Sequence, residues 1–425
     1  MRIIDTPPAS AWKGLSGRKG VDLEGIRPRV KAILDSVEKE GDAALLRLMK
    51  EIDGVEACLE VTKEEIDRAC LKVSPEVRKA ILTAKSNIET FHRAQMPREI
   101  SVETAPGVLC IQRPVPISRV GLYIPGGSAP LFSTVLMLAV PASIAGCQER
   151  ILCTPCLKDG SIAPEVLFAA RECGVTRVFR IGGAQAIAAM AFGTPTVPQV
   201  DKIFGPGNPY VTLAKQIVGS RITSIDMPAG PSEVMVIADR SVPPAFVAAD
   251  MLSQAEHGRD SSAVLLCTEK EYAEEVSGEI DVQKRSLPRT SQVDGALSHS
   301  FAVILPDRDS LVGFAEVYAP EHLIIAVDNA EELAGRITAA GSVFIGPWSP
   351  ESAGDYASGT NHTLPTSGWA RSCSGVNLDS FYRKMTLQKI TREGLASLSP
   401  TIISMARAEG LEAHARAAAI RIQES

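Results

Sequence analysis

The sequence has no excess of basic residues, no disulfide-like cysteine framework and no long uninterrupted apolar run. Its 44 Lys and Arg stand against 50 Asp and Glu, so no basic field is present to attract nucleic acid or an anionic lipid surface. Residues 120–148 carry no charged side chain, but Pro125, Pro130 and Pro141 interrupt them. We therefore expect buried strand and helix there, not a membrane span.

The cysteines and the N-terminus give no sign of secretion. The nine cysteines are an odd number scattered through apolar stretches, which predicts reduced thiols and a cytoplasmic protein. The first residues carry one positive charge, then an acid and two prolines, where a signal peptide would have an apolar run. Cys153 and Cys156 have redox-motif spacing, but no second pair exists for zinc, and we assign them no redox role.

The 425 residues predict two or three domains, and short apolar runs alternate with helical patterns from about residue 117. Seven runs are predicted strands, at residues 150–153, 177–181, 234–238, 263–267, 301–305, 322–327 and 342–345. Because they are apolar at nearly every position, they indicate parallel strands buried on both faces. Residues 29–50 and 75–93 have helical periodicity, and a helical pattern without strands returns after about residue 372. The predicted fold class is α/β with two sheet units.

Two glycine-rich stretches, residues 123–130 and 181–185, follow strand-like segments. Backbone amides at such places can contact anions. Neither stretch contains the G-x-G-x-x-G pattern of dinucleotide-binding motifs or the pattern of a P-loop. Tight strand-to-helix turns explain both stretches without a ligand.

Only six histidines are present, and several stand near other candidate metal ligands. Gln254 and His257 lie three residues apart, on one face of a helix, although a helix C-terminus stabilised by a protonated histidine also explains this pair. Asp355 in a glycine-rich segment and His414 near the C-terminus add a carboxylate and an imidazole. The four offer nitrogen and oxygen ligands without cysteine, as in catalytic zinc sites, and alone favour a metal-assisted hydrolase or lyase.

Glu321 and His322 are adjacent and stand just before or at the start of a predicted strand. Histidine titrates near neutrality and burial raises the pKa of glutamate, so this pair suits proton transfer. A capping role explains the pair equally well. His362 adds one more imidazole to the segment that holds Asp355.

Eight longer motifs follow one another along nearly the whole chain, at residues 120–127, 182–187, 201–208, 225–233, 252–257, 319–322, 354–367 and 410–414. In these motifs the chain resembles the L-histidinol dehydrogenase family. The resemblance implies oxidation of L-histidinol through the aldehyde to L-histidine, with Zn²⁺ and two NAD⁺. It replaces the hydrolase interpretation with that of a dehydrogenase.

The resemblance also implies a role for each candidate residue. One zinc ion per subunit would be held by Gln254, His257, Asp355 and His414. His322 would be the general base, and Glu321 would activate water. The implied substrate contacts are Ser232, Gln254, His257, His322, Asp355, His362, Glu409 and His414, and the implied cofactor contacts are Tyr123, Gln185 and Asn208.

Two incomplete Rossmann-like parallel-sheet domains with small helical elements at both ends are the implied architecture, which accounts for the missing G-x-G-x-x-G pattern. The expected parts are residues 19–125 with 233–372, residues 126–232, a dimerisation element of residues 1–18 with 373–404, and a helical arm of residues 405–425. The resemblance further implies an intertwined homodimer in which Glu409 and His414 reach the partner's active site.

Two other functions stay open at this point. One is the oxidation of a different polar alcohol, such as a sulfonated diol, by the same zinc set. The other is a catalytically inactive, zinc-binding relative. His362 and Glu409 in their motifs favour a substrate with an imidazole, and the presence of Glu321 and His322 argues against an inactive protein.

Overall fold

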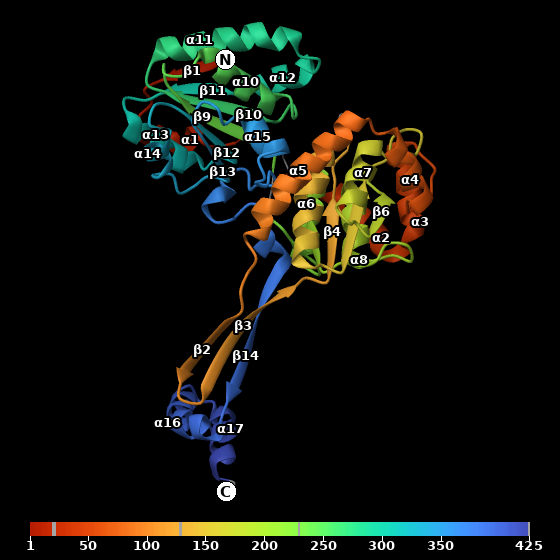
Figure 1. The fold of residues 1–425 in the computed structure, drawn as a ribbon, viewed down its shortest axis with the longest axis vertical. Coiled ribbons are helices and arrows are strands. Elements are labelled where there is room, and N and C mark those ends of the chain that lie inside the picture. Colours follow the sequence, from red (N-terminus) through yellow and green to blue (C-terminus); the bar gives the residue numbers. More distant parts are fainter. Residues whose placement is uncertain (19–22, 127–129, 228–229, 424–425) are drawn as a thin grey trace.

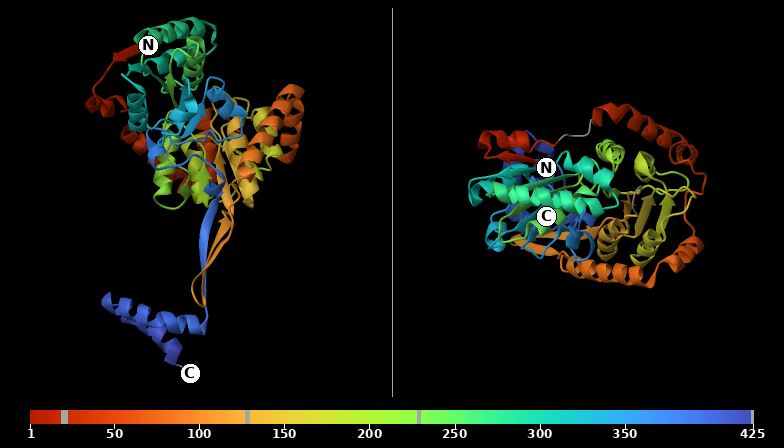
Figure 2. Two further views of the ribbon diagram at one scale, coloured as in Figure 1. Left: turned by 60° about the vertical axis from the view of Figure 1, so that its left-hand side comes forward. Right: turned by 90° about the horizontal axis from the view of Figure 1, so that it is seen from above.

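The computed structural model describes residues 1–18, 23–126, 130–227 and 230–423. Two α/β lobes lie side by side, and a long stalk leads from them to a pair of helices near the C-terminus (Figures 1 and 2). Within the described residues no helix is long and apolar enough to cross a membrane. Residues 127–129 of the first glycine-rich stretch, residues 228–229 of the 225–233 motif and residues 19–22 of the first expected domain lie outside the described residues.

The first lobe, called here the five-stranded lobe, contains a parallel sheet with the strand order β6-β5-β4-β7-β8. Its strands are β4 (Arg119–Tyr123), β5 (Glu149–Thr154), β6 (Arg177–Arg180), β7 (Lys202–Phe204) and β8 (Ser224–Ile225). The chain passes from β4 to β5 and β6 on one side and then to β7 and β8 on the other. The sheet therefore has a topological switch point between β4 and β7, where ligands of such sheets commonly bind.

Helices cover both faces of this sheet. One face carries α4 (Lys63–Lys72), α5 (Pro75–Arg93), α6 (Phe132–Ala145) and α7 (Pro164–Glu172), and the other carries α2 (Leu23–Glu40), α3 (Asp42–Leu48), η1 (Met49–Asp53), α8 (Gly183–Phe192) and α9 (Pro209–Gly219). Along β4, Val120 and Leu122 face the first core and Tyr123 faces the second. This burial on both sides explains why the strands are almost continuously apolar.

The six-stranded lobe contains a parallel sheet with the order β1-β11-β10-β9-β12-β13. Its strands are β1 (Arg2–Asp5), β9 (Glu233–Ala238), β10 (Ser262–Cys267), β11 (Phe301–Ile304), β12 (His322–Ala326) and β13 (Ser342–Ile345). One core lies under α10 (Pro244–Ala255), α11 (Lys270–Gln283), η2 (Lys284–Ser286) and α12 (Thr290–Leu297), and the other under α1 (Ala9–Leu15), α13 (Arg308–Tyr318) and α14 (Ala330–Ala334). The chain moves outward in both directions from β9, which is buried at every position.

Three antiparallel strands form the stalk: β2 (Ile100–Ala105), β3 (Val108–Pro116) and β14 (Tyr382–Ile390). The short elements α15 (Glu351–Tyr356), η3 (Trp369–Arg371) and η4 (Leu378–Phe381) precede β14. At the far end of the stalk, α16 (Arg392–Ala408) packs against α17 (Glu412–Gln423), and these two are called the C-terminal helices (Figure 2).

All seven predicted strands are confirmed, as β5, β6 and β9–β13. The prediction that no strand follows residue 372 is wrong, because β14 spans nine residues. Most of its side chains are exposed, so it lacks the apolar run that marks a strand buried on both faces. The predicted helix at residues 29–50 is divided at Gly41, whose φ of +58° interrupts helical geometry.

The two sheets divide the chain differently from the expected domains. Residues 23–93 pack on the five-stranded sheet, where Val30 and Ile88 are fully buried, and do not join residues 233–372. β1 pairs with β11 and α1 packs on α13, so residues 1–18 are part of the six-stranded lobe and not of an element with residues 373–404. Apolar contacts with each sheet, and not chain order, set this grouping.

Candidate active site

A cluster of acidic and imidazole side chains lies at the amino edge of the six-stranded sheet. His322 is the first residue of β12, and Glu321 directly precedes it. The helix α10 runs back from β9 and places Gln254 and His257 at its C-terminal end. Asp355 comes from α15. Residues from three separate segments therefore meet at one edge.

Asp355 is the centre of this cluster. Its carboxylate lies 3.6 Å from Nε2 of His257, 3.7 Å from Nε2 of His322 and 3.9 Å from Nδ1 of His362. Burial favours the neutral acid, but the hydrogen bond with His257 and the neighbouring imidazoles outweigh it, so the pKa of Asp355 is below its ordinary value. Three imidazoles thus share one ionised carboxylate.

The two ring nitrogens of His322 have different surroundings. Nδ1 faces the carbonyl oxygen of Glu233 at 3.3 Å, the carboxylate of Glu351 at 3.5 Å and that of Glu321 at 3.8 Å. Nε2 is buried and has no hydrogen-bond partner among the described residues. Acceptors around Nδ1 favour a proton there and leave the lone pair on Nε2. Burial lowers the pKa of His322 to about 4, below the near-neutral value expected from the sequence.

Glu321 and Glu351 are buried carboxyl groups beside this imidazole. Burial raises the pKa of both well above the ordinary value for glutamate. Oε2 of Glu321 accepts a hydrogen bond of 2.9 Å from the backbone N–H of Glu233. Oε2 of Glu351 is buried with no partner in the described part of the chain.

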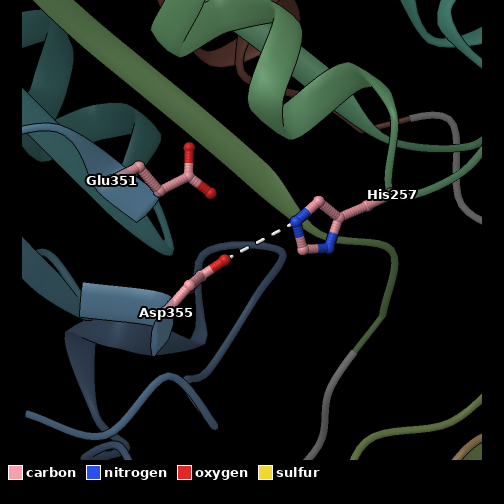
Figure 3. Close-up of side chains that lie close together, drawn as sticks. All are labelled: His257, Glu351 and Asp355. Carbon is pink, nitrogen blue, oxygen red and sulfur yellow. Dashed lines mark ion pairs between the residues drawn. The ribbon is translucent and has the colours of Figure 1, made fainter. Parts of the chain in front are cut away.

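The donor set fits a zinc ion. Two of the expected ligands, His257 and Asp355, have ligand atoms within 4.8 Å of each other; the buried carboxyl group of Glu351 lies within the same distance of both, and the three side chains point toward a common space (Figure 3). Gln254 is fully buried, and neither atom of its amide has a partner among the described residues. Leaving a buried amide unpaired is costly, so these atoms are suited to bind a ligand. Nitrogen and oxygen donors without sulfur match catalytic zinc.

The cluster lies where the two lobes meet. Nε2 of His362 is 3.4 Å from the hydroxyl of Thr134, near the start of α6, and the Asn361 amide donates to the carbonyl of Met137 at 2.7 Å. The start of α6 follows the carboxyl end of β4. The amino edge of the six-stranded sheet therefore faces the carboxyl edge of the five-stranded sheet.

Comparisons with known proteins agree on one family. The sequence model described as histidinol dehydrogenase matches residues 16–422. The histidinol dehydrogenase of Bacteroides thetaiotaomicron is 52% identical over 99% of each chain, and that of Escherichia coli K12 is 52% identical over 94% of this chain and 92% of its own. A crystal structure of histidinol dehydrogenase from Elizabethkingia anophelis matches with a TM-score of 0.96 and 48% identity, over 100% of this chain and 98% of that one. The chain belongs to the histidinol dehydrogenase family.

The residues expected to contact NAD⁺ in this family lie at the carboxyl edge of the five-stranded sheet. Tyr123 ends β4, and its hydroxyl accepts a hydrogen bond of 3.1 Å from the N–H of Gly183. Gln185 is in the first turn of α8 and, like Tyr123, is almost fully buried. Burial raises the pKa of Tyr123 to about 12, so its phenol stays protonated. Asn208 caps α9 by accepting from the N–H of Val211.

The other expected residues are divided between two places. Ser232 is half-buried directly before β9, and its carbonyl accepts from Ser262. Glu409, after α16, and His414, in α17, are exposed and lie at the opposite end of the stalk from the cluster (Figure 1). The structure thus brings all expected residues of the zinc and substrate sites together except Glu409 and His414.

The cluster also contains residues that sequence reasoning did not single out, namely Arg18, Glu233 and Glu351. Glu351 opens the glycine-rich segment of Asp355, and its place at the first position of α15 gives no sign of its contact with His322. Arg18 contacts Glu233 from 215 positions away in the chain, a pairing without a local sequence signal.

Gly205, in the turn between β7 and Asn208, cannot carry a side chain. Its φ is +124°, and an added Cβ would lie 2.1 Å from the carbonyl oxygen of Tyr123. We predict that Gly205→Ala destabilises the protein by about 1–3 kcal/mol and, by moving the turn, raises the KM for NAD⁺ at least about tenfold. Denaturant unfolding and steady-state kinetics with varied NAD⁺ measure the two effects.

Gly54→Ala is the control for this substitution. Gly54 also has a positive φ, +71°, but an added Cβ would meet nothing within 4 Å. Alanine at this position is therefore destabilised by the positive φ but does not collide with neighbouring atoms. Equal KM values for NAD⁺ in the two variants would contradict a role of the Gly205 turn in cofactor binding.

Proposed function

We propose that the protein oxidises L-histidinol through L-histidinal to L-histidine, consuming two NAD⁺ and using one Zn²⁺ per subunit. Family membership identifies the reaction. The observation that carries the assignment of the site is the convergence of Gln254, His257, His322 and Asp355 at the amino edge of one sheet, facing the carboxyl edge of the other.

His322 is the general base of this proposal. Its neutral imidazole presents the lone pair of Nε2 inside the cluster, where it takes the hydroxyl proton as hydride leaves the carbinol carbon. Asp355, 3.7 Å away, stabilises the imidazolium that forms. Bound Zn²⁺ supplies a Lewis acid for substrate nitrogen atoms, with Gln254, His257, Asp355 and a partner's His414 as its proposed ligands, and bound NAD⁺ supplies the hydride acceptor.

Glu321 activates water in the second oxidation, and His322 again takes the hydroxyl proton as hydride leaves. The raised pKa of Glu321 brings its basicity closer to the working pH, which suits removal of a proton from water. Water adds to the aldehyde, and a second hydride then leaves the hydrated carbon for a second NAD⁺. In total, one L-histidinol, two NAD⁺ and one water give L-histidine, two NADH and three protons.

Two subunits share each active site in this proposal. Glu409 and His414 are exposed, and the C-terminal helices that carry them lie at the far end of the stalk from the cluster of their own chain, which leaves them free to contact a partner (Figure 2). The stalk and the C-terminal helices expose Ile100, Val102, Met405, Leu411 and Ile420, each by at least 44%. Apolar surface of this kind is typical of an interface. An intertwined homodimer covers it and completes the zinc site.

We also propose that the protein works in the cytoplasm. All nine cysteines are free thiols, and Cys58 is an exposed one. A reducing compartment keeps such thiols from oxidation.

The experiment that tests this function counts NADH per L-histidinol with the purified protein, before and after removal of zinc. We expect two NADH per substrate, none after chelation, and full recovery when zinc is added back. A sulfonated diol should give no NADH. Turnover that is insensitive to chelation would contradict the zinc assignment. Turnover without NAD⁺ would support the metal-assisted hydrolase interpretation instead.

Asp355→Asn tests the site in the same assay. We expect the variant to lose bound zinc, measured by metal analysis, together with activity. Asp309→Asn is the matched control, because Asp309 lies in the same lobe, is exposed and forms an ion pair with the surface residue Arg336. Retention of zinc by Asp355→Asn would show that the ion is bound elsewhere.

A further inference from the structure

The guanidinium of Arg18 is held at the base of the active-site cluster by a bidentate ion pair. Nε and Nη2 each donate a hydrogen bond of 2.7 Å to one carboxylate oxygen of Glu233. The Glu233 side chain is only 2% exposed and that of Arg18 17%. Such a fork is short and directional, and in a buried place it fixes the orientation of both groups.

The backbone of Glu233 contacts both proposed catalytic residues. Its N–H donates to Oε2 of Glu321 at 2.9 Å, and its carbonyl oxygen is 3.3 Å from Nδ1 of His322. One peptide segment at the start of β9 therefore sets where the Glu321 carboxylate lies and which nitrogen of His322 carries the proton.

Arg18 also holds the turn that leads into these residues. Nη1 donates to the carbonyl of Tyr318 at 2.8 Å, and the guanidinium carbon lies 3.6 Å from the centre of the Tyr318 ring. Tyr318 ends α13, and Ala319 follows with a φ of +50° before Pro320 and Glu321. Arg18 thus bridges the start of β9 and the turn before β12, the two segments that carry the proton-transfer groups.

We propose that Arg18 and Glu233 are positioning residues for Glu321 and His322 in both oxidation steps. This inference rests on the proposed function, because it assumes the roles of those two residues. Arg18 and Glu233 act through the backbone of Glu233 and the Tyr318 turn. Neither exchanges a proton with the substrate.

The test replaces the Arg18–Glu233 ion pair, called here the clamp, and measures kcat separately from the KM for NAD⁺ and the zinc content. Arg18→Met keeps the length of the side chain and removes the fork, and Glu233→Gln keeps the backbone and weakens the pair. We expect kcat for L-histidinol and for L-histidinal to fall about 10- to 100-fold in both variants, with zinc content and the KM for NAD⁺ unchanged. Arg18→Lys, which keeps the charge, should recover part of this loss.

Arg177→Met is the matched control. Arg177 makes the same fork with Glu60, two bonds of 2.7 Å, adds a bond to the carbonyl of Thr196 and lies over the ring of Phe179. This ion pair is in the five-stranded lobe and contacts no residue of the cluster's proton-transfer pair. The control therefore reports the cost of losing an Arg–Glu fork that has no positioning role, and its kcat should stay within about twofold of wild type.

Three results would overturn the inference. A kcat for Arg18→Met within about twofold of wild type would show that the clamp does not position the pair. Equal losses of kcat and thermal stability in Arg18→Met and Arg177→Met would make the role merely structural. Wild-type protein that forms no NADH from L-histidinol would overturn the proposed function as well, which separates that failure from the first two. If Arg18→Met does not fold, Glu233→Gln and Arg18→Lys decide by the same criteria.

Discussion

Mixing His414→Ala subunits with His322→Ala subunits is expected to restore about a quarter of wild-type activity, although neither variant is active alone. In a mixed dimer, one site combines an intact cluster with an intact C-terminal helix pair, and the other site carries both substitutions. Random mixing makes about half of the dimers mixed, each with one intact site of two. Activity per total subunit, after mixed dimers are verified with two different tags, measures the recovery.

The loss in the single variants has a clear physical cause. Removal of a residue that only orients a zinc ligand costs about 10- to 100-fold in affinity or activity, so loss of a proposed ligand should cost at least about 100-fold. His414→Ala should also lose zinc, because it removes one of the four proposed ligands. His322→Ala should keep zinc and lose proton transfer.

A second mixture provides the control. Combining His414→Ala with Glu409→Gln places both substitutions on the C-terminal helices of their own subunits, so every mixed dimer has two damaged sites. This mixture should recover nothing. Recovery here, or no recovery with His322→Ala in verified mixed dimers, would contradict the sharing of sites between subunits.

The sequence predicts best where local chemistry determines structure. β9 is buried at every position, so its apolar run identifies it without knowledge of its neighbours. Gln254 and His257 are predicted to lie close together from their spacing, and the structure places Gln254 in the last turn of α10 and His257 in the turn that follows it. The strand β14 has no such signal, since its side chains face solvent on the isolated stalk.

The site itself depends on contacts that no local pattern encodes. The segments α10, β12 and α15 meet at one sheet edge because α10 runs back across the sheet. No single segment of the sequence encodes this path. The pairing of Arg18 with Glu233 spans 215 positions. The residue pattern supplied the candidate zinc ligands and the proton-transfer pair, and the motif resemblance gave them roles, but neither singled out Arg18 or Glu233.

Glu321→Gln should stop the reaction after the first oxidation. We expect one NADH per L-histidinol and accumulation of L-histidinal, because the second step loses the base that activates water and slows by about 10²- to 10⁴-fold. The amide can still accept the hydrogen bond from the N–H of Glu233, so the position of the side chain is kept and only its basicity is lost. NADH counts with an aldehyde-trapping reagent, and direct assays with L-histidinal, measure each step.

His322→Asn gives the complementary result. His322 is the proposed base in both oxidation steps, so its removal should prevent formation of NADH from L-histidinol and from L-histidinal. The zinc content of Glu321→Gln and of His322→Asn should equal that of the wild type, which would show that the cluster still binds metal. Two NADH from Glu321→Gln at the wild-type rate would contradict its assignment as the water-activating base.

Glu351 is the alternative base that this experiment must distinguish from Glu321. Both carboxyl groups are buried, both have pKa values raised by burial, and both lie within 3.8 Å of the His322 ring. Only Glu321 is fixed by a backbone donor, whereas Oε2 of Glu351 has no partner among the described residues. A carboxylate whose position is fixed is the better base, because proton transfer first requires the base to lie within hydrogen-bond distance of the proton and only then depends on its pKa. Glu351→Gln should therefore still form two NADH per L-histidinol, and a block after the first NADH in that variant would move the role from Glu321 to Glu351.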